Sequence, residues 1–328
     1  MLESDADSVP PQVRKQTELN RPTELNEPVL DIIVIGARAE EQAAIREELS
    51  AHSDEAETRL LIDKMKSYEG IPVHAVRANG SEREYISVGV LECSEMGNIA
   101  AAINSAYAIC RYRPSLVIFS GIAGALDIKK IRVGDVMLPR SITTRDFQKL
   151  KASGDAYSSL SKSEKMEAFE VSNSKLSTFT RTVDVSERGR RLLSQIKLDV
   201  LEAELEKIQV PQHWARDYGI PMRSPSVVRE EVSFSWSNVL SSEPYVNFLK
   251  DRIGAAWTSV EMESYGFLRA VEKVRAIYAT DGIVVRSISD FATHKELTDK
   301  DPQWRSLALR NMAIATRFII QEVFPIAY

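Results

Sequence analysis

Two apolar runs constrain the fold of this chain more than any other feature. The first, LDIIVI at residues 30–35, is followed by Gly36 and a helical pattern over residues 38–49. The second, LVIF at residues 116–119, follows a helical pattern over residues 98–110. Continuous apolar runs are typical of strands covered on both faces, and strands that alternate with helices pair in parallel. The sequence therefore predicts an α/β fold built on parallel strands.

Other segments extend the same pattern. Apolar residues alternate over residues 84–90, and IVVRSI at residues 283–288 is a further strand-like run. The small residues SGIAGA at residues 120–125 predict a turn after the second apolar run. An Asp-Pro pair ahead of residues 303–323 is a helix start signal, and the apolar residues on one face predict a final helix over that range.

The chain divides into a leader and one domain. Residues 1–28 hold prolines among Ser, Asp, Glu, Asn and Gln with few apolar residues, which predicts a flexible leader. Residues 29–328 carry the strand and helix pattern and form the predicted domain. The pattern changes at about residues 141–230, where Ser and Lys are frequent and an amphipathic helix is predicted over about residues 186–209. We interpret residues 141–230 as a helical insertion.

Composition restricts the partners. The chain has 328 residues, 44% of them hydrophobic, and a net charge of -5 without a block of Lys or Arg, so we expect no nucleic-acid partner. It has no apolar run of transmembrane length and no signal-peptide pattern, which favours a cytoplasmic location without membrane contact. The cysteines are expected to be reduced core residues, and neither they nor the histidines show metal-ligand spacing; these residues are Cys93, Cys110, His52, His74, His213 and His294. We therefore expect a small-molecule ligand, no metal and no cofactor.

Carboxylates follow two of the apolar stretches. Glu261 and Glu263 lie two positions apart in VEMES at residues 260–264, and Asp290 follows the last strand-like run. Glu is rarely buried unless it is paired, so these positions indicate a pocket with fixed hydrogen-bond acceptors. The alternative is structural, because the two Glu residues would complement a helix dipole and Asp290 would serve in a cap or turn. The residues alone leave both interpretations open.

Four segments, taken in order, resemble the superfamily of purine nucleoside phosphorylases and methylthioadenosine/S-adenosylhomocysteine nucleosidases. They are IGARAEE at 35–41, SGIAGAL at 120–126 with VGD at 133–135, VEME at 260–263 and VRSISD at 285–290. Their joint occurrence in order and spacing makes the resemblance specific, and it covers roughly residues 30–140 and 227–325. It implies a single three-layer αβα domain with a mixed central sheet, partly closed into a barrel and flanked by helices. We also expect a homo-oligomer.

The resemblance assigns three carboxylates to catalysis. Breaking a ribosyl C1'–N9 bond builds positive charge on the sugar and negative charge on the purine, so the site needs an acid at the base and acceptors around the ribose. Asp290 matches the family residue that faces purine N7, Glu41 the base that activates water, and Glu263 the carboxylate that binds the ribose hydroxyls. Without the resemblance, Glu41 is a solvated residue in the first turn of a helix. The implied reaction is hydrolysis of the N-glycosidic bond of an adenine-type nucleoside or nucleotide.

Further residues are expected to bind the substrate. Met262 matches a side chain that lies against the sugar, and Trp236 is expected either to stack on the base or to lie in the core. The other candidates are Glu261, Ser289, Gly121, Ala123, Ile122 and Arg38. Ile122 stands where some nucleosidases have a hydroxyl residue, and Arg38 stands where an apolar residue is common. A helix N-terminus favours anions, so Arg38 leaves a phosphorylated substrate open, and the insertion is predicted to cover the 5' side or to contact a second subunit.

Two other functions remain open. A phosphorylase uses phosphate in place of water, and family members of that kind usually carry Gly-Asp-Pro-x-Arg where this chain has GARAE. Many of them also place a phosphate-binding Ser where this chain has Ala100. A non-catalytic nucleoside sensor has no need for an acid at N7, so the presence of Glu41, Glu263 and Asp290 favours an enzyme.

Overall fold

The fold is described from a computed structural model. It describes residues 30–65, 71–79, 84–93, 95–127, 130–144, 181–207, 223–229, 232–236, 258–292 and 301–327. The predicted leader at 1–28 lies outside these residues, as do residues 145–180 and 208–222 of the predicted insertion.

A mixed sheet forms the centre of the domain. Its strands are β1 Ile32–Gly36, β2 Val73–Arg77, β3 Tyr85–Glu92, β4 Leu116–Ala125, β5 Val136–Met137, β6 Ser141–Thr144, β7 Arg181–Asp184, β8 Val227–Val228, β9 Val232–Ser235, β10 Ser259–Glu261 and β11 Asp281–Phe291. The order is β2-β3-β1-β4-β10-β9-β6-β7. Outside this path, β11 pairs with both β4 and β5, and β5 also pairs with β8. β1 is parallel to β3 and β4, and β4 is parallel to β11. The mixed α/β sheet that the sequence predicts is confirmed. Among the described strands it branches at β4 and stays open, so they do not form the partly closed barrel that the resemblance implies.

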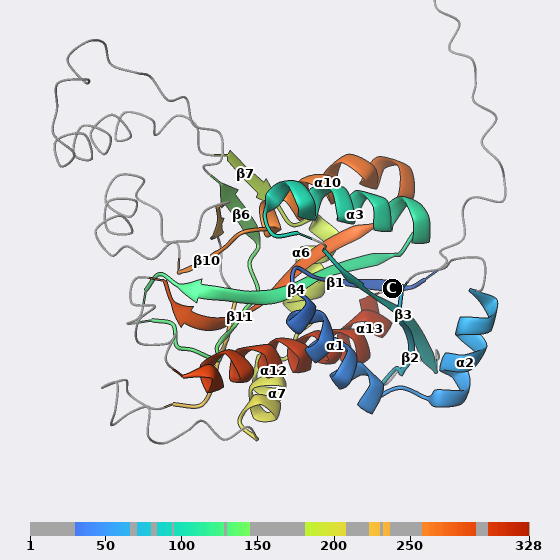
Figure 1. The fold of residues 1–328 in the computed structure, drawn as a ribbon, viewed down its shortest axis with the longest axis horizontal. Coiled ribbons are helices and arrows are strands. Elements are labelled where there is room, and N and C mark those ends of the chain that lie inside the picture. The colour runs from blue at the N-terminus through green and yellow to red at the C-terminus, as the bar shows by residue number, and fades with distance from the viewer. Residues whose placement is uncertain are drawn as a thin grey trace, which may run out of the picture.

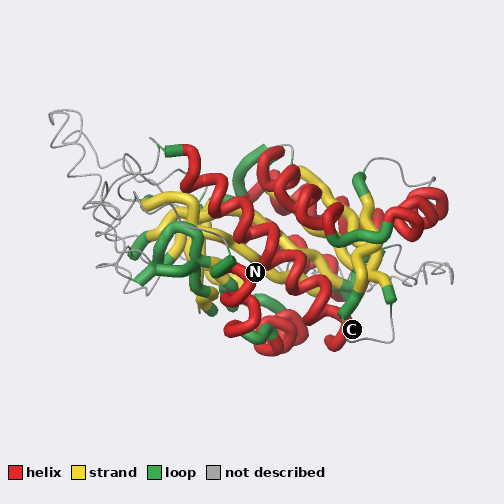
Figure 2. Tube along the Cα trace, turned by 90° about the horizontal axis from the view of Figure 1, so that it is seen from below, coloured by secondary structure: helices red, strands yellow, loops and turns green. Residues whose placement is uncertain are grey.

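Helices cover both faces of this sheet. They are α1 Ala39–Ala51, α2 Glu55–Lys64, α3 Asn98–Tyr112, α6 Glu187–Gln195, α7 Leu198–Leu205, α10 Ser264–Tyr278, α12 Pro302–Phe318, the π-helix η2 Ile319–Val323 and α13 Phe324–Ala327. In Figure 1, α3 and α10 lie together on one side of β4 and β11, while α1 and α12 lie on the other. Figure 2 shows helices in front of the strands when the molecule is seen from below. The order of layers is therefore helix, sheet, helix.

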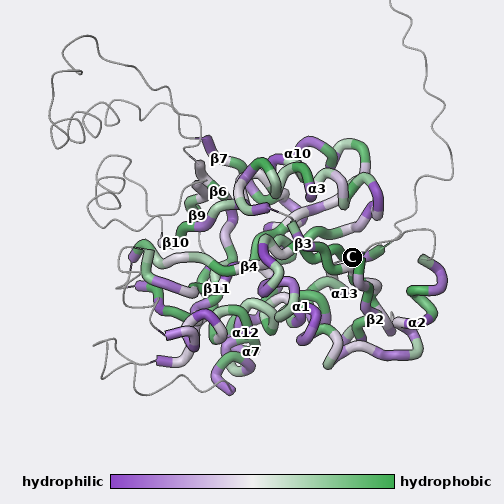
Figure 3. The backbone as a smooth tube through the Cα atoms, in the orientation of Figure 1, coloured by the Kyte–Doolittle hydropathy of each residue, from purple (hydrophilic) through white to green (hydrophobic). Residues whose placement is uncertain are grey.

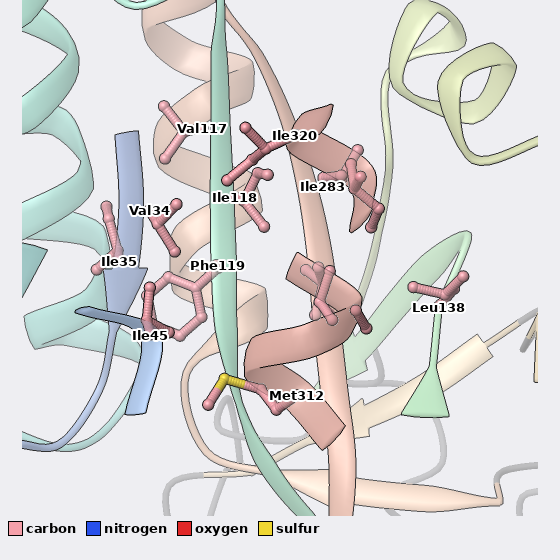
Figure 4. Close-up of a cluster of buried hydrophobic side chains, with 14 of the residues drawn as sticks. Val34, Ile35, Ile45, Val117, Ile118, Phe119, Leu138, Ile283, Met312 and Ile320 are labelled. Atoms are coloured by element: carbon pink, nitrogen blue, oxygen red, sulfur yellow. The ribbon is translucent and has the colours of Figure 1, made fainter. Parts of the chain in front are cut away.

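The core lies where β1, β4 and β11 meet α1 and α12. Figure 4 shows Val34, Phe119, Ile45 and Met312 converging from four of these elements, and all four side chains are fully buried. Burying a side chain of this size contributes roughly 1.5–3 kcal/mol. The surrounding helices alternate between hydrophobic and hydrophilic residues along their length (Figure 3), as expected for helices that pack one face on a sheet. The apolar runs found in the sequence are thus the centre of the packed core.

Residues 120–125 are strand and not the turn that their composition predicts. β4 continues to Ala125 because it pairs with β11 on one side and with β10 on the other. β11 likewise continues through Asp290 to Phe291, with a register shift between Ile288 and Asp290. Ladder pairing on both sides outweighs the conformational freedom of glycine, whose presence marks close approach of other groups.

Asn98 is the first residue of α3, and its side chain bonds to other elements of the fold. α3 begins at Asn98 and its N-cap is Gly97, which has a φ of 102°. The side-chain Oδ1 of Asn98 instead accepts hydrogen bonds from the backbone N of Gly266 (2.9 Å) and from Oγ of Ser235 (3.0 Å). A Cβ at Gly266 would clash with the carbonyl of Asn98. Asn98 therefore satisfies a free N–H at the start of α10, and Gly266 allows the two helices to approach closely.

The described parts of residues 141–230 belong to the body of the domain. They supply β6, β7 and β8 to the sheet, and the helix predicted over 186–209 is two helices, α6 and α7, separated by extended backbone at Ile196. Leu192 and Leu201 of these helices are buried. The sequence did not indicate α2 or β2. Cys110 is exposed, so the prediction that it lies in the core is wrong.

Candidate functional site

A pocket of about 180 Å³ opens at the carboxyl ends of β4 and β11, beside β10 and the N-termini of α1, α10 and α12. Its described lining residues are Ala37, Arg38, Glu41, Met96, Ile122, Ala123, Gly124, Val260, Glu261, Met262, Glu263, Ser289, Asp290, Ala292 and Arg305. Segments far apart in the sequence therefore meet here. This is the edge of a parallel sheet at which ligands of α/β proteins usually bind.

Glu41 lies in the first turn of α1, buried against β4. Its side chain is 2% exposed; Oε1 accepts a hydrogen bond from the N of Ile122 (2.9 Å) and Oε2 accepts one from the N of Arg38 (3.0 Å). Burial raises the pKa of Glu41, while the charge of Arg286 and these hydrogen bonds oppose the rise. The solvated position that a helical first turn suggests is therefore wrong for this Glu.

Gly121 makes room for this arrangement. A Cβ there would clash with Nη1 of Arg286 and would lie 2.8 Å from Oε1 of Glu41. Gly121 thus lies directly behind the carboxylate, and any larger residue would displace the charged groups. Gly124 has the same role further along β4, because a Cβ at Gly124 would lie 2.9 Å from Oδ1 of Asp290.

Glu261 and Glu263 flank the start of α10. Oε2 of Glu261 accepts hydrogen bonds from the backbone N of Glu263 (2.9 Å) and of Ser264 (2.8 Å), so it satisfies donors at the helix N-terminus. Oε1 of Glu263 accepts one from the N of Gly97 (3.1 Å). Burial raises the pKa of Glu263 to about 7, with Arg286 acting in the opposite direction. Both interpretations of this pair therefore hold, since the carboxylates complement the helix and also line the pocket.

Arg286 is the main residue that the sequence reasoning missed. It lies in the middle of β11, is 1% exposed, and places Nη2 2.5 Å from Oε2 of Glu261 and 3.6 Å from Oε2 of Glu263. Its guanidinium stacks 4.9 Å from the ring centroid of Phe119. An Arg within the apolar run at 283–288 was the available signal, because a buried cation requires buried anions. We call Glu41, Glu261, Glu263 and Arg286 the floor of the pocket.

Ser289 and Asp290 stand at the bulge in β11. The register shifts between Ile288 and Asp290, and bulges re-aim side chains at the ends of strands. Oγ of Ser289 lies 2.8 Å from Oδ2 of Asp290 and 3.3 Å from the carbonyl of Ala123. The turn at Gly134 and Asp135 supports this region, because the N of Gly134 donates to Ile288 (2.8 Å).

Arg38 and Arg305 occupy the outer edge of the pocket. Arg38 is the N-cap residue of α1, and Arg305 lies in the first turn of α12. Nε of Arg38 lies 3.0 Å from Oε1 of Glu40, and Nε of Arg305 lies 2.9 Å from Oε2 of the same carboxylate. The hydrogen bond from Arg305 is the main cause that lowers the pKa of Glu40. We call these three residues the rim; Arg305 was not identified from the sequence.

The other predicted residues divide between the pocket and its surroundings. Met262, Ile122 and Ala123 line the pocket. Trp236 is not among the described lining residues; its backbone N donates to the carbonyl of Glu261 (2.8 Å), and its ring lies 6.1 Å from that of Phe234.

Within the described ranges, no cluster of three or more His, Cys, Asp or Glu residues could hold a metal ion. None of the helices in the described part of the chain is long and apolar enough to span a membrane.

Comparisons with known proteins identify the family to which the fold belongs. The family model of the phosphorylase superfamily matches residues 31–320. No curated protein matches the chain. Among solved structures, a 5'-methylthioadenosine/S-adenosylhomocysteine nucleosidase from Colwellia psychrerythraea 34H in complex with adenine has a TM-score of 0.54 and 16% identity, covering 90% of this chain and 96% of its own. The corresponding nucleosidase from Helicobacter pylori gives 0.51 and 17%, covering 90% and 99%.

A third solved structure widens the range of substrates in the comparison. Futalosine hydrolase of Helicobacter pylori strain 26695 has a TM-score of 0.50 and 18% identity, covering 89% of this chain and 97% of its own. At such identities the structures establish a shared fold. The family match spans most of the chain and includes all four segments from which the resemblance was drawn. The chain therefore belongs to the phosphorylase superfamily.

Proposed function

We propose that this protein is a purine nucleosidase that hydrolyses the N-glycosidic bond of an adenine-type nucleoside or nucleotide. The observation that carries the proposal is the position of Glu41, a buried carboxylate in the same pocket as Glu263 and Asp290. In this proposal Asp290 is the acid at N7, Glu41 activates water and Glu263 binds the ribose hydroxyls. The solved nucleosidase that holds adenine supports the choice of base.

The proposed reaction uses each carboxylate for one step. The C1'–N9 bond breaks and its electron pair moves into the purine, while Asp290 gives its proton to N7. Water attacks C1' of the oxocarbenium-like sugar and loses a proton to Glu41, so that the products are free base and free ribose. General acid or base catalysis of this kind contributes about 10²- to 10⁴-fold.

The surroundings of Glu41 support water as the nucleophile. Phosphate carries nearly two negative charges at neutral pH and is bound by Arg and backbone donors, whereas Glu41 and Glu263 present carboxylates. Burial raises the pKa of Glu41, which makes its carboxylate a stronger base. In the proposed function, Arg286 is a positioning residue. Its charge holds Glu261 and Glu263 in place and favours the deprotonated form of Glu41, which is the form that can act as a base.

A base-release assay tests the proposal. Purified protein is supplied with purine nucleosides and nucleotides in phosphate-free buffer, and the base and sugar products are separated by chromatography. We expect release of adenine and free sugar without phosphate. Turnover that appears only when phosphate is added, with a ribose 1-phosphate product, would identify a phosphorylase. Binding of nucleosides without any base release, under both conditions, would identify a sensor.

We also propose that the protein is a homo-oligomer. Ile99, Ile103 and Tyr107 are exposed at helical spacing and form an apolar stripe along α3, and the exposed Met96, which precedes the helix, also lines the pocket. Exposed apolar stripes of this kind are typical of subunit contacts. Light scattering after gel filtration should give a multimer for the native chain and a monomer for Ile103→Asp; a native monomer would contradict the proposal.

A further inference from the structure

The floor and the rim of the pocket carry opposite net charge. The floor holds three carboxylates and one guanidinium, whereas the rim holds two guanidiniums and one carboxylate, that of Glu40. At the rim the side chains of Arg38 and Arg305 are 48% and 37% exposed. A ligand with one anionic end would therefore be oriented with that end at the rim and its uncharged part toward the floor.

Both arginines can bind a further anion while they remain paired with Glu40. A guanidinium has five N–H donors, and the contacts with Glu40 involve Nε of Arg38 and Nε and Nη2 of Arg305. Within the rim, the two positive charges exceed the negative charge of Glu40 by one, and Glu41 and Asp290 also act electrostatically on Arg305. Glu40 thus holds the two side chains at the edge of the pocket without neutralising them.

The chemistry of a purine nucleoside shows which group would meet the rim. An adenine-type base is neutral, and in the proposed function its N7 faces Asp290 while the 2' and 3' hydroxyls face Glu263. The 5' carbon is the remaining position that can carry a charged substituent. An apolar substituent there would strip water from two guanidiniums without replacing their hydrogen bonds, which is costly.

We propose that Arg38 and Arg305 bind the phosphate of a 5'-phosphorylated purine nucleoside, so that the substrate is a nucleotide. This inference rests on the proposed function for the direction in which the substrate lies. Arg is well suited to phosphate because its planar fork can donate two parallel hydrogen bonds. The carboxylates of Glu41 and Glu263 would exclude the phosphate from the floor.

A phosphate at the rim has two possible sources, the 5' group of the substrate or free inorganic phosphate. The assay therefore compares AMP with adenosine, each with and without added inorganic phosphate. We expect AMP to be hydrolysed with a kcat/KM at least about tenfold above that of adenosine, since the charge-assisted hydrogen bonds to its phosphate outweigh the screening at the half-exposed rim. Added inorganic phosphate should inhibit AMP hydrolysis. Stimulation by inorganic phosphate, or equal use of adenosine and AMP, would overturn the proposal.

Substitution of the rim residues ties this preference to the two arginines. Arg38→Gln combined with Arg305→Gln should lower the ratio of kcat/KM for AMP to that for adenosine by about 10- to 100-fold. The matched control is Arg59→Gln on α2, because that side chain is 79% exposed, pairs with Glu55 and lies away from the pocket. The control should leave the ratio unchanged. A double variant that keeps the native ratio would contradict the assignment.

A binding measurement separates failure of this inference from failure of the proposed function. Calorimetric titration of Glu41→Gln with AMP and with adenosine reports affinity without turnover. Tighter binding of AMP that weakens in the variant also carrying the two rim substitutions supports the rim site, even if no base is released from any compound. Equal affinity for AMP and adenosine would overturn the rim site whether or not the native protein hydrolyses adenosine.

Discussion

The floor and the rim of the pocket hold the same types of charged residue in different surroundings. In the floor, Glu41, Glu261, Glu263 and Arg286 are all at most 5% exposed, and three carboxylates share one guanidinium. In the rim, the side chains of Arg38, Glu40 and Arg305 are between 35% and 48% exposed. Solvent screens the charges of the rim but not those of the floor.

This difference decides how each group titrates. Burial raises the pKa of Glu41 and brings that of Glu263 to about 7, whereas the pKa of the half-exposed Glu40 is lowered by its bond to Arg305. Glu263 of the floor therefore exchanges its proton near neutral pH, whereas Glu40 of the rim stays charged. Under the proposed function, the floor serves the chemistry and the rim recognises charge.

Removal of Arg286 should have the largest effect. Arg286→Met leaves the buried carboxylates without their cation, and breaking a buried ion pair in this way costs about 3–5 kcal/mol. Urea denaturation at pH 8 followed by circular dichroism measures the loss. Arg59→Met, on the exposed surface of α2, is the control and should change stability by less than about 0.5 kcal/mol. Equal stability of the two variants would mean that the floor charges are solvated after all.

Asp290→Asn is expected to lower kcat by at least about 10²-fold while substrate binding stays largely intact, because the amide cannot give a proton to N7. Steady-state kinetics of base release, with affinity measured by calorimetry, checks both parts. Ser306→Ala, a surface change in α12, serves as the control. Full activity of Asp290→Asn would show that Asp290 serves only the structure of the bulge.

Stability should also depend on pH through Glu263. Its folded pKa of about 7 lies above the usual 4.5, so the folded state holds the proton more tightly and stability falls as pH rises from about 4.5 to about 7. The rise corresponds to about 3 kcal/mol at most. Unfolding of the native chain and of Glu263→Gln is compared at pH 5 and pH 8. The native chain should lose more stability between the two pH values than the variant does, and parallel losses would refute the buried titration.

The rim should contribute least to stability. Arg305→Gln removes a half-exposed ion pair with Glu40, and such pairs contribute about 0–1 kcal/mol. Thermal unfolding at low and high salt should show a small difference that salt reduces further. A loss of several kcal/mol would place the rim in the same class as the floor and remove the contrast between them.

Much of the fold followed from local patterns, and the exceptions have a common cause. The runs at 30–35 and 283–288 are strands because a continuous apolar segment is stable only in a covered sheet. Residues 120–125 form a strand despite their turn-like composition, because β10 and β11 pair with them from segments more than 130 residues away. Pairing over such separations leaves no local signal.

Some residues of the site were predicted from the sequence and others were not. Glu41, Glu261, Glu263 and Asp290 lie near the ends of strands or the starts of helices, and the family resemblance assigned them to the site before their contacts were known. The sequence did not identify Arg286 and Arg305, because the role of an Arg depends on which carboxylates lie beside it in the folded chain. Glu261 and Glu40 come close to these arginines only in the folded chain.

The central claim is that Glu41 directs water, and not phosphate, to the sugar. The direct measurement is release of adenine and free sugar by the native protein and by Glu41→Gln in phosphate-free buffer, with the substrate that is used fastest. The account predicts turnover without phosphate in the native protein and a loss of at least about 10²-fold in the variant. Turnover that needs phosphate, or phosphate-free turnover that survives in Glu41→Gln, would contradict it.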